Sequence, residues 1–214
     1  MRSTIFTLTI LMLTIVANAQ TSKKAEAILN KASQVLEQAD GIKLSFTLSP
    51  DTPDGEAFEA QEGVAFIKKE KFKLDMPYST TWFNGSTQWV LLKDANEVNI
   101  SNPTSEEMAM ISPLGILNMY KTNYLLKDPV ERTFNGKNAT EIELTPINEW
   151  QDFERLVIVL DNKTNNVMMV RFETRDGNKS KLTISSYNSS NKFTNDLFQF
   201  NKDNHPGVEI IDLR

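Results

Sequence analysis

The sequence predicts a mainly β fold with some helix (α+β): one sheet of about ten antiparallel strands, a long N-terminal helix and a small helical insert. Three observations predict this fold. Apolar residues recur at helical spacing over residues 22–39, and the periodicity then changes to two. Most of the strand-like runs that follow are joined by tight turns, with no room for a crossover helix, so neighbouring strands must pair antiparallel.

Two segments have helical signatures. In residues 22–39, Ser22 can cap the start of the helix, and Gly41 stands where a helix end favours a left-handed residue. The insert begins with the capping box Thr104-Ser105-Glu106-Glu107. The Met-rich segment Met108–Tyr120 follows and is broken by Ser112-Pro113, so we expect it to be mobile and to lie over the open face of the sheet.

The strands are expected from apolar alternation between turn signals such as Asn84-Gly85, a strong two-residue hairpin motif. Their ranges are 42–48, 63–68, 72–76, 80–83, 88–92, 97–100, 140–145, 153–161, 167–174 and 181–187. One or two edge strands are expected at 197–200 and 208–211.

Residues 1–19 have the three parts of a cleavable secretory signal peptide. Arg2 is their only charge, an apolar run covers residues 5–16, and Ala17-Asn18-Ala19 offers the small residues that a signal peptidase reads. An uncleaved anchor helix is the alternative, but it needs about 20 apolar residues. We therefore expect an exported, soluble protein in which residues 20–214 form a single domain.

Composition excludes several classes of protein. The chain has no cysteine, which excludes disulfides, thiol enzymes and Cys-ligated metal sites. Its net charge is −5, or −6 once Arg2 has left with the signal, and no basic cluster favours nucleic-acid binding. His205 is the only histidine, so we expect no His-based catalysis, no metal and no cofactor.

One pair of carboxylates could indicate an enzyme and has to be considered. Glu141 and Glu143 lie two apart on a predicted strand and so point to one face. A glycosidase needs a second carboxylate opposite the first across a cleft. A solvated outer face opposite Ile142 and Leu144 explains the pattern better, so an enzyme is not expected.

Apolar bulk is abundant instead. Phenylalanine and tryptophan recur in the strand-like runs, and a single curved sheet has one concave face to fill. That face either closes into a dry core or leaves a cavity for an apolar ligand. Patterning alone slightly favours the dry core, whereas the flexible methionines of the insert favour a variable partner.

The ordered set of segments resembles the LolA family of periplasmic outer-membrane lipoprotein carriers. Phe83–Trp89 is like the family's D-G-x-x-x-W hairpin with Asn for Asp, and Ile142–Pro146 is like its strand ending in L-x-P. Leu197–Phe200 with Pro206-Gly207-Val208 is like its F-x-F…P-x-G-V ending, with one residue missing. Further matching pieces are Gly41–Phe46, Glu62–Lys69 and Lys71–Leu74.

This resemblance implies an incomplete antiparallel β-barrel whose helices form a lid over a hydrophobic cavity. It implies a monomeric, non-enzymatic carrier that accepts acylated lipoproteins from an inner-membrane ABC transporter and passes them to an outer-membrane receptor. An apolar sleeve suits such cargo, since exposing acyl chains to water costs about 0.8 kcal/mol per CH₂. A lipoprotein- or lipid-sensing module on the same scaffold, and a carrier of another lipid, remain open.

The resemblance also points to a lid latch at Lys69, where some family members have an arginine that bonds to the lid backbone. Lysine lacks the planar fork of donors and is not equivalent, so the closed resting state stays open.

Alternate residues of a strand point to the same face of the sheet. The apolar set of alternate residues from each strand therefore gives a candidate acyl-chain site. At Phe66 and Trp82 the parity is ambiguous, because Ile67 and Phe83 have a comparable claim. The candidates are Leu44, Phe46, Phe66, Leu74, Trp82, Trp89, Leu156 and Ile158 from the strands, and Met108, Ile111, Leu114 and Leu117 from the insert.

Overall fold

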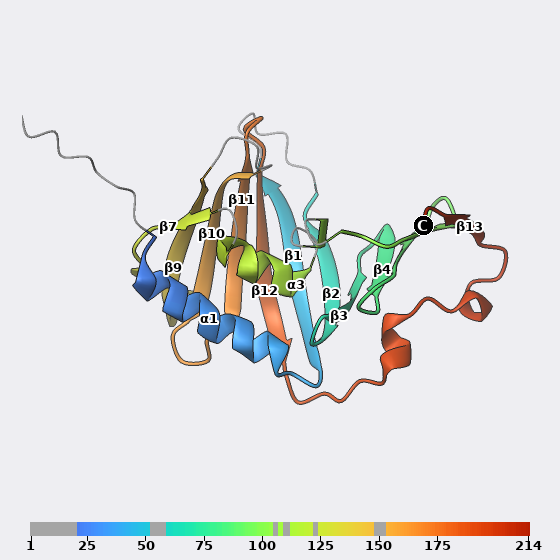
Figure 1. Cartoon of the computed structure of the whole chain (residues 1–214), viewed down its shortest axis with the longest axis horizontal. Helices are drawn as coiled ribbons and strands as arrows, with labels where there is room; N and C mark the ends of the chain where they lie inside the picture. The colour runs from blue at the N-terminus through green and yellow to red at the C-terminus, as the bar shows by residue number, and fades with distance from the viewer. Residues whose placement is uncertain (1–20, 52–58, 105–106, 109–111, 122–123, 148–152) are drawn as a thin grey trace, which may run out of the picture.

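The structure, a computed structural model of the chain, describes residues 21–51, 59–104, 107–108, 112–121, 124–147 and 153–214. The predicted signal peptide lies outside the described residues. In the part described, thirteen strands form one open sheet, and helices cover one of its faces (Figure 1). The predicted class, an unclosed and mainly antiparallel sheet with an N-terminal helix and a short helical insert, is confirmed.

The strands form two antiparallel meanders. The first contains β1 (Ile42–Asp51), β2 (Gln61–Lys68), β3 (Lys71–Asp75), β4 (Ser79–Phe83), β5 (Gln88–Leu92) and β6 (Glu97–Ser101). The second contains β8 (Val130–Phe134), β9 (Lys137–Pro146), β10 (Phe153–Asp161), β11 (Val167–Thr174) and β12 (Lys179–Asn188). The short β7 (Tyr124–Leu126) pairs with β9 beside β8.

A single pairing joins the two meanders. The last strand, β12, runs antiparallel to the first, β1, from Lys43↔Asn188 to Asp51↔Lys179. The strand order is therefore β13-β6-β5-β4-β3-β2-β1-β12-β11-β10-β9-β7, with both ends of the sheet left open. This seam between β1 and β12 makes one continuous surface from segments that are far apart in sequence.

Three details differ from the prediction. β7 and β8 were not expected, because β7 has three residues and β8 is largely exposed and lacks an apolar alternation. The strand predicted at 197–200 is wrong: Asn195–Phe198 forms a 3₁₀ turn, η2. The last strand, β13 (Glu209–Asp212), pairs with β6 in parallel rather than antiparallel.

The N-terminal helix, α1 (Lys23–Glu37), lies across the concave face of the sheet (Figure 1). The Ser22 hydroxyl caps it by accepting the Ala25 N–H at 3.3 Å. Gly41, however, is not left-handed, so that expectation is wrong. A Cβ there would lie 2.5 Å from the carbonyl oxygen of Asn191, and the close approach of the two backbones explains the glycine.

The helical insert continues as predicted where it is described. The Thr104 N–H donates to the Glu107 carboxylate at 2.7 Å, and the Glu107 N–H donates to the Thr104 hydroxyl at 3.3 Å, so the capping box is confirmed. Ser112 caps α3 (Pro113–Asn118), which runs into the 3₁₀ turn η1 (Met119–Lys121). No helix in the described ranges combines the length and apolarity needed to cross a membrane.

A second apolar cluster covers the opposite face of the first meander. The C-terminal segment, residues 191–208, runs along the outside of β2 to β6 and carries the 3₁₀ turn η3 (Lys202–Asn204). Its Phe193 ring contacts Phe66 at 5.7 Å between centroids, and its Phe200 ring contacts Trp82 at 5.6 Å. The strands of this meander are therefore apolar on both faces.

The turn between β10 and β11 is held by one buried carboxylate. Asp161 accepts the N–H groups of Lys163 at 2.8 Å and Thr164 at 3.1 Å, and its other oxygen lies 3.5 Å from the Lys137 ammonium. Burial by itself would raise the pKa of Asp161, but these bonds and the Lys137 charge outweigh it and hold the pKa below its usual value.

Asp161 should make the fold acid-sensitive. Because its pKa is lowered in the folded state, the ionised Asp161 carboxylate stabilises the fold. This contribution is fully present above the unfolded-state pKa, about 3.9 for Asp, and it is lost as the pH falls through the folded-state pKa. We expect Asp161→Asn to lower the free energy of unfolding at pH 7 and to lose less stability than wild type between about pH 5 and pH 2. Urea unfolding at several pH values measures this, with the exposed Asp94→Asn as control. Parallel pH profiles for Asp161→Asn and wild type would contradict it.

Candidate functional site

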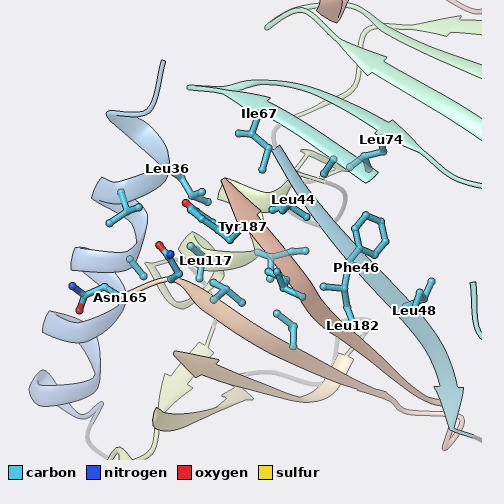
Figure 2. A pocket seen from close by; sticks show the side chains of 18 of the residues that line it. Leu36, Leu44, Phe46, Leu48, Ile67, Leu74, Leu117, Asn165, Leu182 and Tyr187 are labelled. Carbon is cyan, nitrogen blue, oxygen red and sulfur yellow. The ribbon is translucent and has the colours of Figure 1, made fainter. Parts of the chain in front are cut away.

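A cavity of about 320 Å³ lies between the sheet and the helices (Figure 2). Helix α1 closes it with Ala32, Val35 and Leu36, and α3 closes it with Ile116 and Leu117. The first meander contributes Leu44, Phe46, Leu48, Ala65, Ile67, Leu74 and Met76. The second contributes Asn165, Asn166, Val167, Val170, Phe172, Leu182, Ile184 and Tyr187.

The chemistry of this lining is almost entirely hydrocarbon. Among the described residues that line it, Asn165, Asn166 and Tyr187 alone carry a side-chain nitrogen or oxygen. The volume is at the lower end of the range for small-molecule sites, roughly 300–1,000 Å³. Such a lining suits an uncharged and mainly apolar group, since a charge would be costly to bury there.

The cavity occupies only part of the concave face. Above β9 and β10, Ile142, Leu144, Leu156 and Ile158 are fully buried in a core packed under the helices. The hollow part lies on either side of the β1–β12 seam. The sequence left a dry core and a ligand cavity as alternatives, and the structure has one of each, side by side.

Four of the predicted site residues line the cavity: Leu44, Phe46, Leu74 and Leu117. Leu156 and Ile158 belong to the dry core of the same face, and Met108 is half-buried against that core. Ile111 lies outside the described residues. Leu114 is in α3, but the described part of the structure does not extend to its side chain.

Phe66, Trp82 and Trp89 were assigned to the wrong face. The register pairs Lys73 with both Phe66 and Trp82, and Trp82 with Trp89, and paired residues share a face. Trp82 and Trp89 pack in the cluster with Leu91, Val98, Ile100, Val208 and Phe200. The inward positions belong to Ile67 and Phe83. The C-terminal segment makes the outer face apolar too, so alternation alone could not separate the two faces.

Sequence reasoning missed the contribution of β12. Tyr187 and Ile184 both line the cavity, although residues three apart in a regular strand point to opposite faces. The register shifts there: Leu44 pairs with Tyr187, but Phe46 pairs with Ile184. A β-bulge at Ser185, whose hydroxyl donates to the Ser45 carbonyl at 3.2 Å, turns both side chains inward. Simple alternation carries no signal for such a bulge.

Two partly buried hydrogen bonds connect α1 to the insert. The Ser33 hydroxyl donates to the Asn118 side-chain oxygen at 2.9 Å, and the Tyr120 hydroxyl donates to Asn30 at 2.5 Å. Lys69, the predicted latch, is exposed in the left-handed turn between β2 and β3. It lies with Asn118 and Glu37 around a separate surface pocket, and its latch role stays a prediction.

The charged groups lie away from the cavity. Glu143 bonds to Arg155 at 2.5 Å and to Lys127, and Glu141 lies 3.5 Å from Arg132. Burial would raise the pKa of Glu143, but Arg155 and Lys127 outweigh it and keep this carboxyl ionised. His205 stacks on Phe200 in the C-terminal segment. Within the described residues, no three His, Asp or Glu side chains gather as a metal site.

The family model described as "Outer membrane lipoprotein carrier protein LolA" matches residues 15–178. A comparison with curated proteins finds no match. An uncharacterized conserved protein from Thermus thermophilus is 12% identical, with a TM-score of 0.63 over 89% of this chain and 99% of that chain.

Two further solved structures are more distant. A LolA superfamily protein from Nitrosomonas europaea is 11% identical, with a TM-score of 0.45 over 84% of this chain and 99% of that chain. LprF from Mycobacterium bovis is 11% identical, with a TM-score of 0.45 over 82% of this chain and 100% of that chain.

At these identities the Thermus structure shows the shared fold alone, and the family assignment comes from the family model. The matched range contains α1, the insert and the strands from β1 to β11. The family is one of non-enzymatic carriers that are typically periplasmic. The chain belongs to the LolA family of outer membrane lipoprotein carrier proteins.

Proposed function

We propose that this protein is a periplasmic carrier that binds the acyl chains of lipoproteins in the cavity and shuttles them from the inner to the outer membrane. The observation that carries the proposal is the cavity itself: an apolar space of about 320 Å³ that the side chains leave unfilled. Interiors of proteins are normally packed to few voids larger than a water molecule. An apolar hollow of this size supports a role in binding an apolar ligand.

Acyl chains fit the energetics of this site. Each CH₂ group moved out of water contributes about 0.8 kcal/mol, so a long chain crossing an aqueous compartment gains strongly from an apolar lining. Phe46, Leu74 and Phe172 supply that lining, and no charged residue described here faces the cavity. Membership of the LolA family makes a lipoprotein the natural source of the chains.

Loading requires the helices to move. The cavity is small for a cargo with several chains, and α1 and α3 cover it without belonging to the sheet. The partly buried hydrogen bonds Ser33–Asn118 and Tyr120–Asn30 hold these helices together, and each such bond contributes only about 0.5–1.5 kcal/mol. The helices therefore act as one lid that can lift as a unit.

The remaining partners follow from the family. We propose an inner-membrane ABC transporter as the donor and an outer-membrane receptor as the acceptor, with the protein acting as a monomer. Lys69 is a further candidate contact for the lid, since it lines the same surface pocket as Asn118 at the end of α3. Mass spectrometry of protein purified from its native host identifies the cargo: lipoprotein supports the carrier function, free lipid indicates a different carrier, and an empty protein contradicts the proposal.

Substitution of the cavity wall should abolish binding. We expect Phe46→Glu to lose binding of a fluorescent acyl probe, because an unpaired charge is costly to bury against the acyl chain. Ile210→Glu, which adds the same charge at an exposed position on β13, should bind like wild type. Fluorescence titration measures binding, and circular dichroism checks the fold.

If Phe46→Glu does not fold, Ile184→Trp provides an uncharged test, since it fills the cavity from a half-buried position. Probe binding that is unchanged in both folded variants would place the ligand elsewhere. A wild-type protein that binds no acyl probe would contradict the carrier function.

The lid bonds should control release. The double variant Ser33→Ala, Tyr120→Phe removes both hydroxyl donors between α1 and the insert. We expect it to release the acyl probe up to about 30-fold faster, since two bonds of about 1 kcal/mol each are lost from the closed state and every 1.4 kcal/mol is tenfold. Stopped-flow displacement measures the rate, with the exposed Tyr78→Phe as control. A release rate equal to wild type would show that these bonds do not hold the lid.

Export should remove the signal peptide. Ala17 and Ala19 stand where a signal peptidase reads small residues, so we expect the mature protein to begin at Gln20. Intact-mass measurement of protein from the periplasmic fraction checks this, and retention of residues 1–19 would contradict it.

A further inference from the structure

One polar atom in the cavity has no partner. The Tyr187 hydroxyl oxygen is fully buried, and no group among the described residues forms a hydrogen bond with it. Burial raises the pKa of Tyr187 to about 12, so the hydroxyl keeps its proton at neutral pH and remains a donor. Its ring lines the cavity among leucine and isoleucine side chains.

The inward direction of Tyr187 is built into the sheet. The bulge at Ser185 sets the register so that Tyr187 lies directly opposite Leu44 across the seam and shares its inward face. In Figure 2 the ring lies between the strands and α1, with its hydroxyl oxygen at the end nearer the helix. If the protein needed only an apolar surface at this position, phenylalanine would provide it without burying a polar atom.

Other polar groups of the lining lie at the same end. Asn165 and Asn166 close the turn that Asp161 holds, and they directly precede Val167 at the start of β11. Tyr187 is near the end of β12, beside this start of β11. At the opposite end the lining is hydrocarbon, with Leu48 and Leu182 paired across the seam. The cavity thus has one polar end and one apolar end.

A buried donor without a partner costs free energy unless a ligand supplies the acceptor. An acyl chain joined through an ester or amide carries one strong acceptor, its carbonyl oxygen, at one end of a hydrocarbon chain. This pattern matches the cavity, in which one buried donor stands near the polar end.

We propose that the Tyr187 hydroxyl donates a hydrogen bond to the carbonyl oxygen of an ester- or amide-linked acyl chain. The carbonyl then lies at the α1 end of the cavity, the head group faces Asn165 and Asn166, and the chain runs toward Leu48 and Phe172. This assignment rests on the proposed acyl-carrier function and adds to it a ligand class and an orientation. The site selects acyl chains over plain alkyl chains of the same length.

A matched pair of ligands tests the assignment. Delipidated protein is loaded with N-phenyl-1-naphthylamine, a fluorescent apolar probe without a carbonyl, and the probe is displaced by 1-palmitoylglycerol or by its ether analogue 1-O-hexadecylglycerol. We expect Tyr187→Phe to weaken binding of the ester about five- to tenfold, the effect of one neutral hydrogen bond, and to leave binding of the ether unchanged. Tyr78→Phe, at an exposed position, should bind both ligands like wild type.

Stability of the empty protein gives a second readout. Removing an unpaired buried hydroxyl should leave the denaturant midpoint of Tyr187→Phe equal to or above that of wild type. A lower midpoint would show that the hydroxyl has a protein partner and would overturn the proposal. Equal affinity of Tyr187→Phe and wild type for the ester, or equal weakening of both ligands, would overturn it while leaving the carrier function intact. Failure of wild type to bind either ligand would overturn the carrier function and this assignment with it.

Discussion

The pairing of β1 with β12 is the constraint on which the rest of the structure depends. It brings residues 43–51 against residues 179–188 and joins two local meanders into one surface. Each meander alone is a small antiparallel sheet with an apolar face and nothing to cover it. Once joined, they present a single concave face that α1 can cross, and the cavity straddles this seam.

The division of the concave face into a dry part and a hollow part follows from what each strand presents. β9 and β10 present a continuous set of branched side chains, including Ile142, Leu144 and Ile158, that pack to full burial. Nearer the seam, small residues alternate with large ones. Gly63 faces Phe46, and a Cβ at Gly63 would lie 2.4 Å from the Phe46 ring. Ala65 is opposite Leu44. The helices cover both parts but fill only one, so the packed part and the hollow part occupy different regions of a single sheet.

The helices meet the sheet mainly through apolar contacts. Polar bonds such as Ser33–Asn118 run between the two helical elements, whereas α1 itself meets the sheet through apolar side chains such as Leu29 and Leu36. At its start, the N–H of the capping residue Ser22 donates to the Leu126 carbonyl of β7 at 3.1 Å. Apolar contacts are non-directional, so a hydrocarbon ligand can replace them without leaving a polar group unpaired. Tyr187 is the exception, since its hydroxyl is buried and no described group forms a hydrogen bond with it.

The sequence by itself determined most of the elements and much of the chemistry. Periodicity located α1 and ten of the strands, the capping box at Thr104 and Glu107 was correct, and alternation placed Leu44, Phe46 and Leu74 on the inward face. These features are local, because capping and strand parity depend on residues a few positions apart. The segments that carry the LolA resemblance could be recognised for the same reason, because each consists of residues that are close together in the sequence.

Only the tertiary structure decided which of two apolar faces bounds the cavity. Trp82 and Phe66 alternate as inward residues would, but the C-terminal segment, more than a hundred residues further along the chain, covers their face instead. The Ser185 bulge reverses the parity of β12 and turns Tyr187 inward, and it exists only in the pairing with β1. Whether the concave face is filled depends on how closely the helices approach it. These outcomes arise from contacts between distant segments, and such contacts leave no periodic trace in the sequence.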